Sequence, residues 1–392
     1  MATKSTSLKK AVEILDLKQE LLIIIFSKLS VTSLLRLKSV CKSWYTLITS
    51  PSFVTMHLNS KDRHKDYLGF ITYGSNSIYI SFFSYHTMEF SSSLRQHLNA
   101  KFVGFSKGLL CVVTKNEKSF YAINPATKEY KLLKEPNNHL AGHTAYGFVS
   151  ACYGFAFDSK ANDYKLVRVT IQNIAEVLTL KSNSWRSILM NDHSTSVMKR
   201  VWNLVDPWSK AVTKNALHWI VMDQKIKKFI IAFDIVNEEF RDIKIPGDID
   251  QDYCSYHCSV LEDCLSVSIL NTRPSVIENK IEVWMMKEYG VEGSWTKQYS
   301  FSAQNHYRNE CIFNCMLRGI KGEWDSDDIF PLAEPMRPDF DEFFDLYKLP
   351  SHDTDKFFDL YKLFSHYGGF MFCFRESLIP IDRKEEDQFL LG

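Results

Sequence analysis

Two groups of residues have types and spacings that could carry chemistry. Gly104, Ser106 and Gly108 match the pattern G-x-S-x-G, which in hydrolases places a serine nucleophile on a sharp turn between a strand and a helix. The run that follows, residues 109–113, is apolar and typical of a strand. We therefore expect turn glycines at this point, and a hydrolase with Ser106 as its nucleophile is the less favoured alternative.

The second group consists of cysteines and one histidine, whose side chains are zinc ligands when they occur in paired knuckles. An alternating pattern places these residues in or beside strands, where cysteine commonly serves as a small core residue. No phosphate-binding loop, dinucleotide fingerprint or other catalytic motif accompanies them. We expect no metal, no cofactor and no enzyme, with zinc as the alternative. The residues are Cys254, His257, Cys258, Cys264, Cys311 and Cys315.

Composition narrows the class of protein. Lys and Arg number 47 and Asp and Glu 46, and this balance is not that of a general nucleic-acid binder. Nine cysteines, an odd number in a long chain, indicate free thiols in a reducing compartment, so we expect a cytosolic or nuclear protein. The early apolar run 21–26 is too short to span a bilayer, so we expect no membrane segment.

Residues 11–58 carry apolar side chains at helical spacing, with a helix stop at Ser50-Pro51. A helical unit of this size is marginal on its own, so part of its apolar surface should meet the rest of the chain or another protein. The periodic residues are Leu17, Leu21, Leu22, Ile25, Leu29, Leu34, Leu37, Cys41, Trp44 and Ile48.

After about residue 100 the chain is built from short strand-like runs, and a turn followed by an aromatic residue recurs in it. Tyr130, Trp185, Phe240 and Trp295 close these segments, each 55 residues after the last. A period near 50 with about four strands per repeat is the signature of a propeller blade. We predict an α+β chain with a helical domain at 11–58, a connecting segment at 59–100 and a β-propeller-like domain of five or six blades at 101–385. The alternative is one large β-sandwich.

Residues 323–359 hold twelve acidic side chains against three basic ones. Such a run is by default a solvated acidic loop, and the alternative is a contact surface for a basic partner. Six of these acids are the candidate contact patch: Asp325, Asp327, Asp328, Asp339, Asp341 and Glu342.

Residues 15–53, and above all SLLRLKSVCKSWYTLI at 33–48, resemble the F-box of plant F-box proteins. The later runs INPATKEYKLL, YGFAFDSKANDYKLVRV and VLTLKSNSWRSI follow the order of the plant F-box-associated domain, so the resemblance covers about residues 11–305. Residues 283–299 are similar to S-locus F-box proteins, the pollen-side factors of self-incompatibility.

The resemblance implies a non-catalytic adaptor. Its F-box would bind a Skp-type linker, and through it the cullin and RING subunits of a Skp–cullin–F-box ubiquitin ligase, while the distal domain holds a protein substrate. The S-locus likeness implies a non-self secreted ribonuclease (S-RNase) as substrate, and the alternatives are an unrelated plant substrate or a scaffold no longer coupled to a ligase. The implied linker contacts are Leu17, Leu21, Ile25, Leu29, Val31, Leu34 and Leu35, with Trp44 closing the F-box core and adding some contact.

The chain departs from the family at two positions. Lys18 and Ser30 stand where the family usually has proline, which is pre-organised for the first helical position. Lys18 near a helix N-terminus also opposes the helix dipole by roughly 0.3–1 kcal/mol. We expect linker binding weaker than in a typical member.

Overall fold

The computed structural model describes most of the chain between residues 19 and 381. The described ranges are 19–59, 67–73, 78–84, 89–96, 100–114, 119–136, 151–170, 174–189, 191–201, 203–204, 211–246, 254–261, 263–271, 279–303, 329–332, 369–374 and 377–381. Among these residues no helix is long and apolar enough to cross a membrane.

Four short helices form the N-terminal unit: α2 (Gln19–Ser27), α3 (Val31–Leu37), α4 (Lys42–Thr49) and α5 (Pro51–Asn59). Ser30 begins α3, because its hydroxyl accepts a hydrogen bond from the Ser33 backbone N–H (3.3 Å). Phe26 packs edge-to-face on Trp44, with ring centroids 5.0 Å apart, and both are buried in the helical core. The Nε2 atom of His57 on α5 is hydrogen-bonded to the Leu29 carbonyl at 3.0 Å, which links α5 to the segment between α2 and α3.

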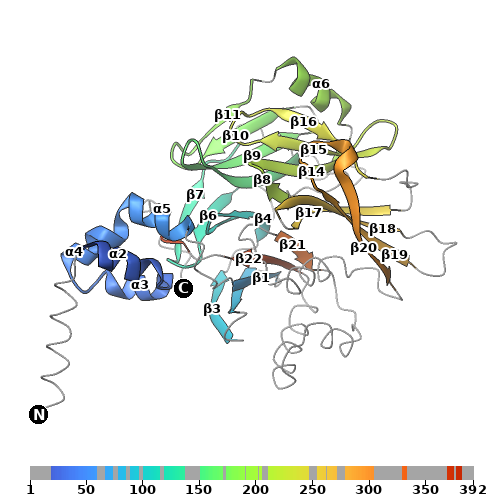
Figure 1. Ribbon diagram of the computed structural model, residues 1–392. Coiled ribbons are helices and arrows are strands. Elements are labelled where there is room, and N and C mark those ends of the chain that lie inside the picture. Colours follow the sequence, from blue (N-terminus) through green and yellow to red (C-terminus); the bar gives the residue numbers. More distant parts are fainter. Residues whose placement is uncertain are drawn as a thin grey trace, which may run out of the picture.

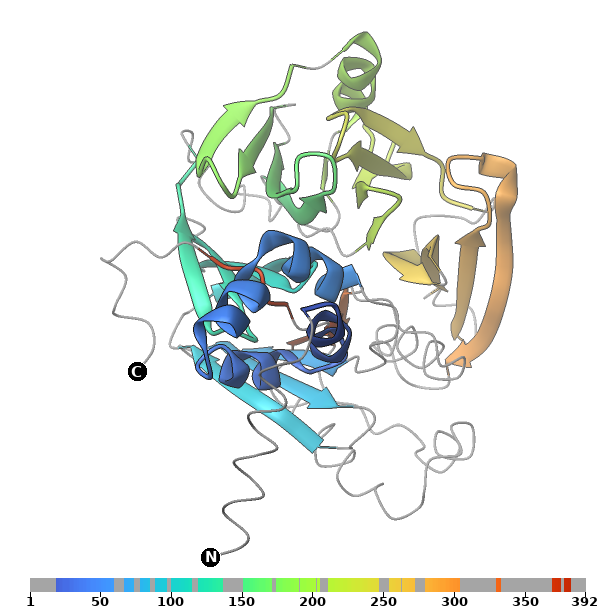
Figure 2. The same ribbon diagram turned by 60° about the vertical axis from the view of Figure 1, so that its left-hand side comes forward.

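In the described part of the chain the strands form five antiparallel sheets, and Figures 1 and 2 show them arranged around a common centre, with α2–α5 on one side beside β6 and β7. We call them blades 1 to 5. Blade 1 contains β1 (Tyr67–Tyr73), β2 (Ile78–Ser84), β3 (Glu89–Gln96), β21 (Ile329–Leu332) and β22 (Gly369–Phe374). Blade 2 contains β4 (Ala100–Ser106), β5 (Leu109–Thr114), β6 (Phe120–Asn124) and β7 (Glu129–Leu133).

The remaining blades follow in chain order. Blade 3 contains β8 (Ala151–Asp158), β9 (Asp163–Thr170), β10 (Ala175–Thr179) and β11 (Ser184–Ser187). Blade 4 contains β12 (Asn203–Leu204), β13 (Ala211–Thr213), β14 (Ala216–Met222), β15 (Lys228–Asp234) and β16 (Phe240–Ile243), preceded by α6 (Asp192–Arg200). Blade 5 contains β17 (Cys254–Leu261), β18 (Cys264–Asn271), β19 (Asn279–Met286) and β20 (Trp295–Ala303). The predicted α+β architecture with a propeller-like domain is confirmed.

Blade 1 differs from the prediction, which made residues 59–100 a connecting segment. Those residues supply β1, β2 and β3, and β1 pairs with β22 from the C-terminal part of the chain. Both ends of the β domain therefore share one sheet, which joins the last strands to the first. β1, β2 and β3 are consecutive in the chain, but the other two strands of this sheet, β21 and β22, come after blade 5, so blade 1 as a whole shows no local repeat in the sequence.

The predicted repeat is confirmed. Tyr130, Trp185, Phe240 and Trp295 each lie at or next to the start of the last strand of blades 2, 3, 4 and 5, and all four are buried. The two tryptophans make the same contact with the preceding blade. Trp185 Nε1 donates to the Lys134 carbonyl (2.6 Å) and Trp295 Nε1 donates to the Lys244 carbonyl (3.0 Å).

The turns before these aromatic residues repeat as well. Lys128, Asn183 and Glu238 have φ values of 59°, 48° and 59° and lie at the same step of 55 residues. A left-handed residue at this fixed place sets the register of the outer hairpin in blades 2, 3 and 4, although two of the three are not the Asn or Gly that such a φ favours.

Candidate functional site

Helix α2 carries large apolar side chains on two faces, one buried and one exposed. Leu22 and Phe26 are buried in the helical core. On the other face Leu21, Ile24 and Ile25 are 47%, 54% and 45% exposed. At 100° per residue these three fall within about one third of the helix circumference. We call them the exposed α2 face.

Three more large apolar side chains of the helical unit are exposed: Val40 after α3, Tyr45 on α4 and Met56 on α5. Leu29 and Leu35, which sequence reasoning assigned to the linker contact, are partly buried against the helical core. A cluster of exposed apolar residues on a small unit is characteristic of a protein-binding surface, whereas single exposed leucines are ordinary.

The structure places several predicted contact residues elsewhere. Val31 and Leu34 are fully buried in the helical core, so they are unavailable to a partner in this conformation. Trp44 is buried against Phe26, as expected for the residue that closes the core. Leu17 lies outside the described residues. The linker contacts implied by the family resemblance include Leu21 and Ile25, which are exposed, and do not include the exposed Ile24, Val40 and Tyr45.

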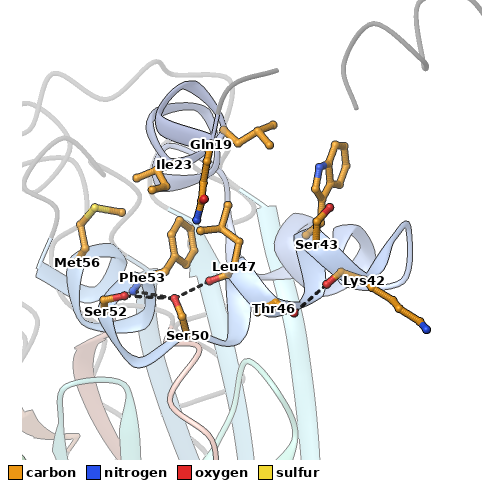
Figure 3. A pocket seen from close by; sticks show the side chains of 12 residues that line it. Gln19, Ile23, Lys42, Ser43, Thr46, Leu47, Ser50, Ser52, Phe53 and Met56 are labelled. Carbon is orange, nitrogen blue, oxygen red and sulfur yellow. Dashed lines mark hydrogen bonds between the residues drawn. The ribbon is translucent and has the colours of Figure 1, made fainter. Parts of the chain in front are cut away.

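A groove of about 720 Å³ lies between α2, α4 and α5, on the side of α2 opposite the exposed face (Figure 3). Leu22, Ile23, Leu47 and Phe53 give it an apolar floor, and Ser50 lies at its edge. The Ser50 hydroxyl donates to the Leu47 carbonyl (2.8 Å) and accepts from the Phe53 N–H (3.3 Å), which fixes the junction of α4 and α5.

The G-x-S-x-G motif does not form a nucleophile elbow. Ser106 ends β4 and the chain turns directly into β5, so the motif lies between two strands. Its side chain is buried and accepts a hydrogen bond from the Phe157 N–H (3.1 Å). This geometry removes the hydrolase alternative, because the elbow needs an exposed hydroxyl at the start of a helix.

Of the candidate zinc ligands, those at residues 254–264 lie in blade 5. Cys254 and Cys258 on β17 are buried in the hydrophobic cluster between blades 4 and 5. Within the described part of the chain, no group of three His, Cys, Asp or Glu side chains could hold a metal ion. Cys311 and Cys315 fall outside the described residues, and so does the whole acidic patch of Asp325, Asp327, Asp328, Asp339, Asp341 and Glu342.

Comparison with known families assigns both units. Residues 74–319 match the F-box associated beta propeller domain, and residues 14–57 match an F-box-like domain. The chain belongs to the F-box proteins with an associated propeller. The F-box match lies within residues 11–58, the range that the sequence analysis gave to the helical domain. The propeller match begins at residue 74, inside the segment that was predicted to be a connection, and it includes β2 and β3 of blade 1.

Relatives in Arabidopsis thaliana cover most of the chain. F-box protein CPR1 is 26% identical over 302 residues, covering 70% of each chain. F-box/kelch-repeat protein At3g23880 is 25% identical and covers 82% of this chain and 84% of its own. Among solved structures, TolB from Acinetobacter baumannii aligns with a TM-score of 0.37 and 9% identity, over 62% of this chain and 56% of TolB.

Proposed function

We propose that this protein is the substrate-recognition adaptor of a Skp–cullin–F-box ubiquitin ligase. The F-box binds a Skp-type linker, which brings the cullin and RING subunits, and the propeller holds the protein to be ubiquitinated. As an adaptor, the chain supplies binding surfaces and no reacting group. Family membership supports this role, and so do the F-box-named relatives that cover most of the chain.

The exposed α2 face carries the linker-binding part of the proposal. An aliphatic helix face presented to solvent is suited to burial in a groove of a partner protein. Burying an aliphatic side chain completely is worth about 1.5–3 kcal/mol. Leu21, Ile24 and Ile25 have about half of their surface left to bury. Together they offer about 3 kcal/mol, which corresponds to roughly a hundredfold in affinity.

The decisive test is a triple variant, Leu21→Ala, Ile24→Ala and Ile25→Ala, titrated with a Skp-type linker by calorimetry. We expect the dissociation constant to rise roughly a hundredfold while the far-ultraviolet circular dichroism spectrum stays unchanged, because the F-box core keeps Leu22 and Phe26. A matched control replaces three exposed aliphatic residues of the propeller, Leu132, Leu189 and Val291, with alanine. Equal affinity of both variants and the original chain would refute docking through α2.

The same titration separates the adaptor from its alternative, a propeller scaffold that no longer couples to a ligase. If the protein were such a scaffold, the unmutated chain would not bind the linker. The expected weakening from Lys18 and Ser30 would instead appear as a modest increase in the dissociation constant, which Ser30→Pro should reverse in part.

For the substrate, the narrower hypothesis is a basic secreted ribonuclease (S-RNase), and the alternative is an unrelated plant protein. Only the sequence resemblance of residues 283–299 to S-locus F-box proteins supports the ribonuclease. A basic substrate would be steered by acidic side chains, an effect that salt screens. Neutralising Asp325, Asp327, Asp328, Asp339, Asp341 and Glu342 should slow association with a basic ribonuclease at low salt and leave linker binding unchanged. Equal association rates at low salt would remove these acids from recognition.

A further inference from the structure

Residues 377–381, which follow β22, run between the F-box and blade 2 (Figure 2). We call this segment the C-terminal strap. Leu378 is buried in the F-box core, whereas Ile381 is buried in the cluster between blades 2 and 3. Ile379 packs against both clusters. The strap therefore contributes side chains to the hydrophobic cores of both units.

Asn124, the last residue of β6, holds the strap to blade 2. Its side-chain Nδ2 donates to the carbonyls of Ser377 (3.0 Å) and Ile379 (2.9 Å). Its Oδ1 accepts from the backbone N–H groups of Ala126 (3.0 Å) and Thr127 (3.3 Å) in the β6–β7 turn. The residue is fully buried, and both ends of the amide are occupied, so only an amide satisfies turn and strap together.

The position that corresponds to Asn124 in blade 4 shows what the strap adds. Asp234 lies two 55-residue steps later and makes the same turn, with Oδ1 accepting from the N–H groups of Val236 (2.8 Å) and Asn237 (2.9 Å). No strap residue bonds to it among the described residues, and a carboxylate suffices there. Blade 2 needs the amide because the strap presents two carbonyl acceptors.

Glu129 on β7 gives the strap a second attachment and links it to the F-box electrostatically. Its Oε2 accepts from the Ile381 N–H (3.2 Å) and from the Thr127 hydroxyl (3.0 Å). Burial lowers the pKa of Lys38, at the end of α3, and the negative charge of Glu129 acts in the opposite direction. Ala126, in the turn that Asn124 holds, packs directly against the F-box core.

We infer that the C-terminal strap fixes the orientation of the F-box on the propeller, with Asn124 as the positioning residue. Residues 60–66 alone join α5 to β1 along the chain, and a single covalent connection does not set the orientation of two units. The strap adds a second connection at blade 2. Building on the proposed function, a fixed orientation would hold the substrate at a set distance from the ligase subunits bound to the F-box.

The test measures the distance between the two units in the full-length chain. Spin labels carried by noncanonical amino acids at Met56 in the F-box and at Leu189 in the propeller, both exposed, report this distance by double electron–electron resonance. Asn124→Asp keeps the acceptor for the turn and places a second carboxylate oxygen against the strap carbonyls. We expect a narrow distribution in the original chain and a broadened or shifted one in Asn124→Asp.

The matched control is Asp234→Asn, which makes the converse change at the corresponding turn of blade 4 and should leave the distribution narrow. Leu378→Ala removes the side chain that anchors the strap in the F-box and should broaden it, which gives a second measurement if Asn124→Asp does not fold. A lower unfolding midpoint with an unchanged distribution in both strap variants would show a merely structural role and overturn the inference.

Because the distances are measured without any linker protein, the outcome does not depend on the ligase proposal. Linker affinity, measured separately, should change less than twofold in Asn124→Asp, since the exposed α2 face is untouched. A chain with the expected distances and no linker binding would refute the adaptor function and leave the strap inference standing.

Discussion

Lys165 on β9 is the buried cation that joins blades 3 and 4, and its removal gives a sharp test of how the scaffold is held together. Its Nζ lies 2.7 Å from Asp158 and 2.8 Å from Glu238, and it donates to the Ile235 carbonyl at 2.6 Å. The Lys165 side chain is only 5% exposed, and Asp158 only 4%. Asp158 belongs to blade 3, whereas Ile235 and Glu238 belong to the β15–β16 turn of blade 4.

We predict that Lys165→Met lowers the free energy of unfolding by about 3 kcal/mol at pH 7. Breaking a buried ion pair by removing one partner costs about 3–5 kcal/mol, because an uncompensated charge stays buried. The lower end applies here since both carboxylates keep other donors. Asp158 still accepts from the Lys160 and Ala161 N–H groups, and Glu238 still pairs with Arg186.

The loss of unfolding free energy caused by Lys165→Met should become smaller as the pH falls. Burial alone would raise the pKa of Asp158 and of Glu238, but hydrogen bonds and the charge of Lys165 outweigh it, so both pKa values lie below the ordinary range. In the original chain these groups stabilise the fold above about pH 4 and lose that contribution as the pH falls. Without Lys165, its charge and hydrogen bonds no longer offset burial, so the carboxylates take up protons at a higher pH than in the original chain, and the two chains should converge in acid.

Urea unfolding of both chains at pH 7 and pH 4.5 measures this difference, and contributions shared by the two chains cancel. Lys160→Met, at an exposed lysine of the adjacent β8–β9 turn, is the control and should change stability by less than about 0.5 kcal/mol. A cost for Lys165→Met that is the same at both pH values would refute the electrostatic explanation and leave packing as the cause.

Three further predictions concern buried side chains, two through a hydrogen bond and one through a pKa. Trp185→Phe and Trp295→Phe each remove one indole hydrogen bond to the preceding blade, so thermal unfolding should show about 1 kcal/mol lost per substitution, additively in the double variant. Ser106→Ala leaves the buried Phe157 N–H without its acceptor and should cost about 1–3 kcal/mol without changing any esterase background in a chromogenic ester assay. Burial lowers the pKa of His218 to about 4, so this residue stabilises the fold above pH 6.5 and loses that effect as the pH falls towards 4; His218→Gln should flatten the stability profile in that interval.

The propeller was predictable where its geometry repeats locally. Each of blades 2 to 5 ends in a hairpin whose turn and following aromatic are close in sequence, so Tyr130, Trp185, Phe240 and Trp295 revealed the period. Blade 1 has no such signature, because β1 pairs with β22 across about three hundred residues. A sheet assembled from both ends of a chain leaves no local pattern that spacing could detect.

The F-box surface was only partly predictable for a different reason. Residues 21–26 are apolar without interruption, so periodicity could not assign a buried face and an exposed face to α2. Packing makes the assignment: Leu22 and Phe26 turn towards Trp44 and the rest of the core, which leaves Ile24 in solvent. Val31 and Leu34 are buried because α3 also packs into this core, beside Leu22 and Phe26 of α2.

The departure at Ser30 shows how a missing family residue can be replaced by different chemistry. Proline would pre-set the backbone at the start of α3, whereas Ser30 has an extended backbone, with φ −64° and ψ 155°, and its hydroxyl oxygen caps the helix by accepting a hydrogen bond from the Ser33 N–H. A serine cap is worth about 1 kcal/mol, so the start of α3 is stabilised by a hydrogen bond instead of by a restricted ring. Since α3 begins with the buried Val31, the cap also keeps the core side chain in place beneath α2. Serine in place of proline at position 30 therefore does not loosen the start of α3. Its effect on linker affinity comes instead from the backbone conformation just before α3.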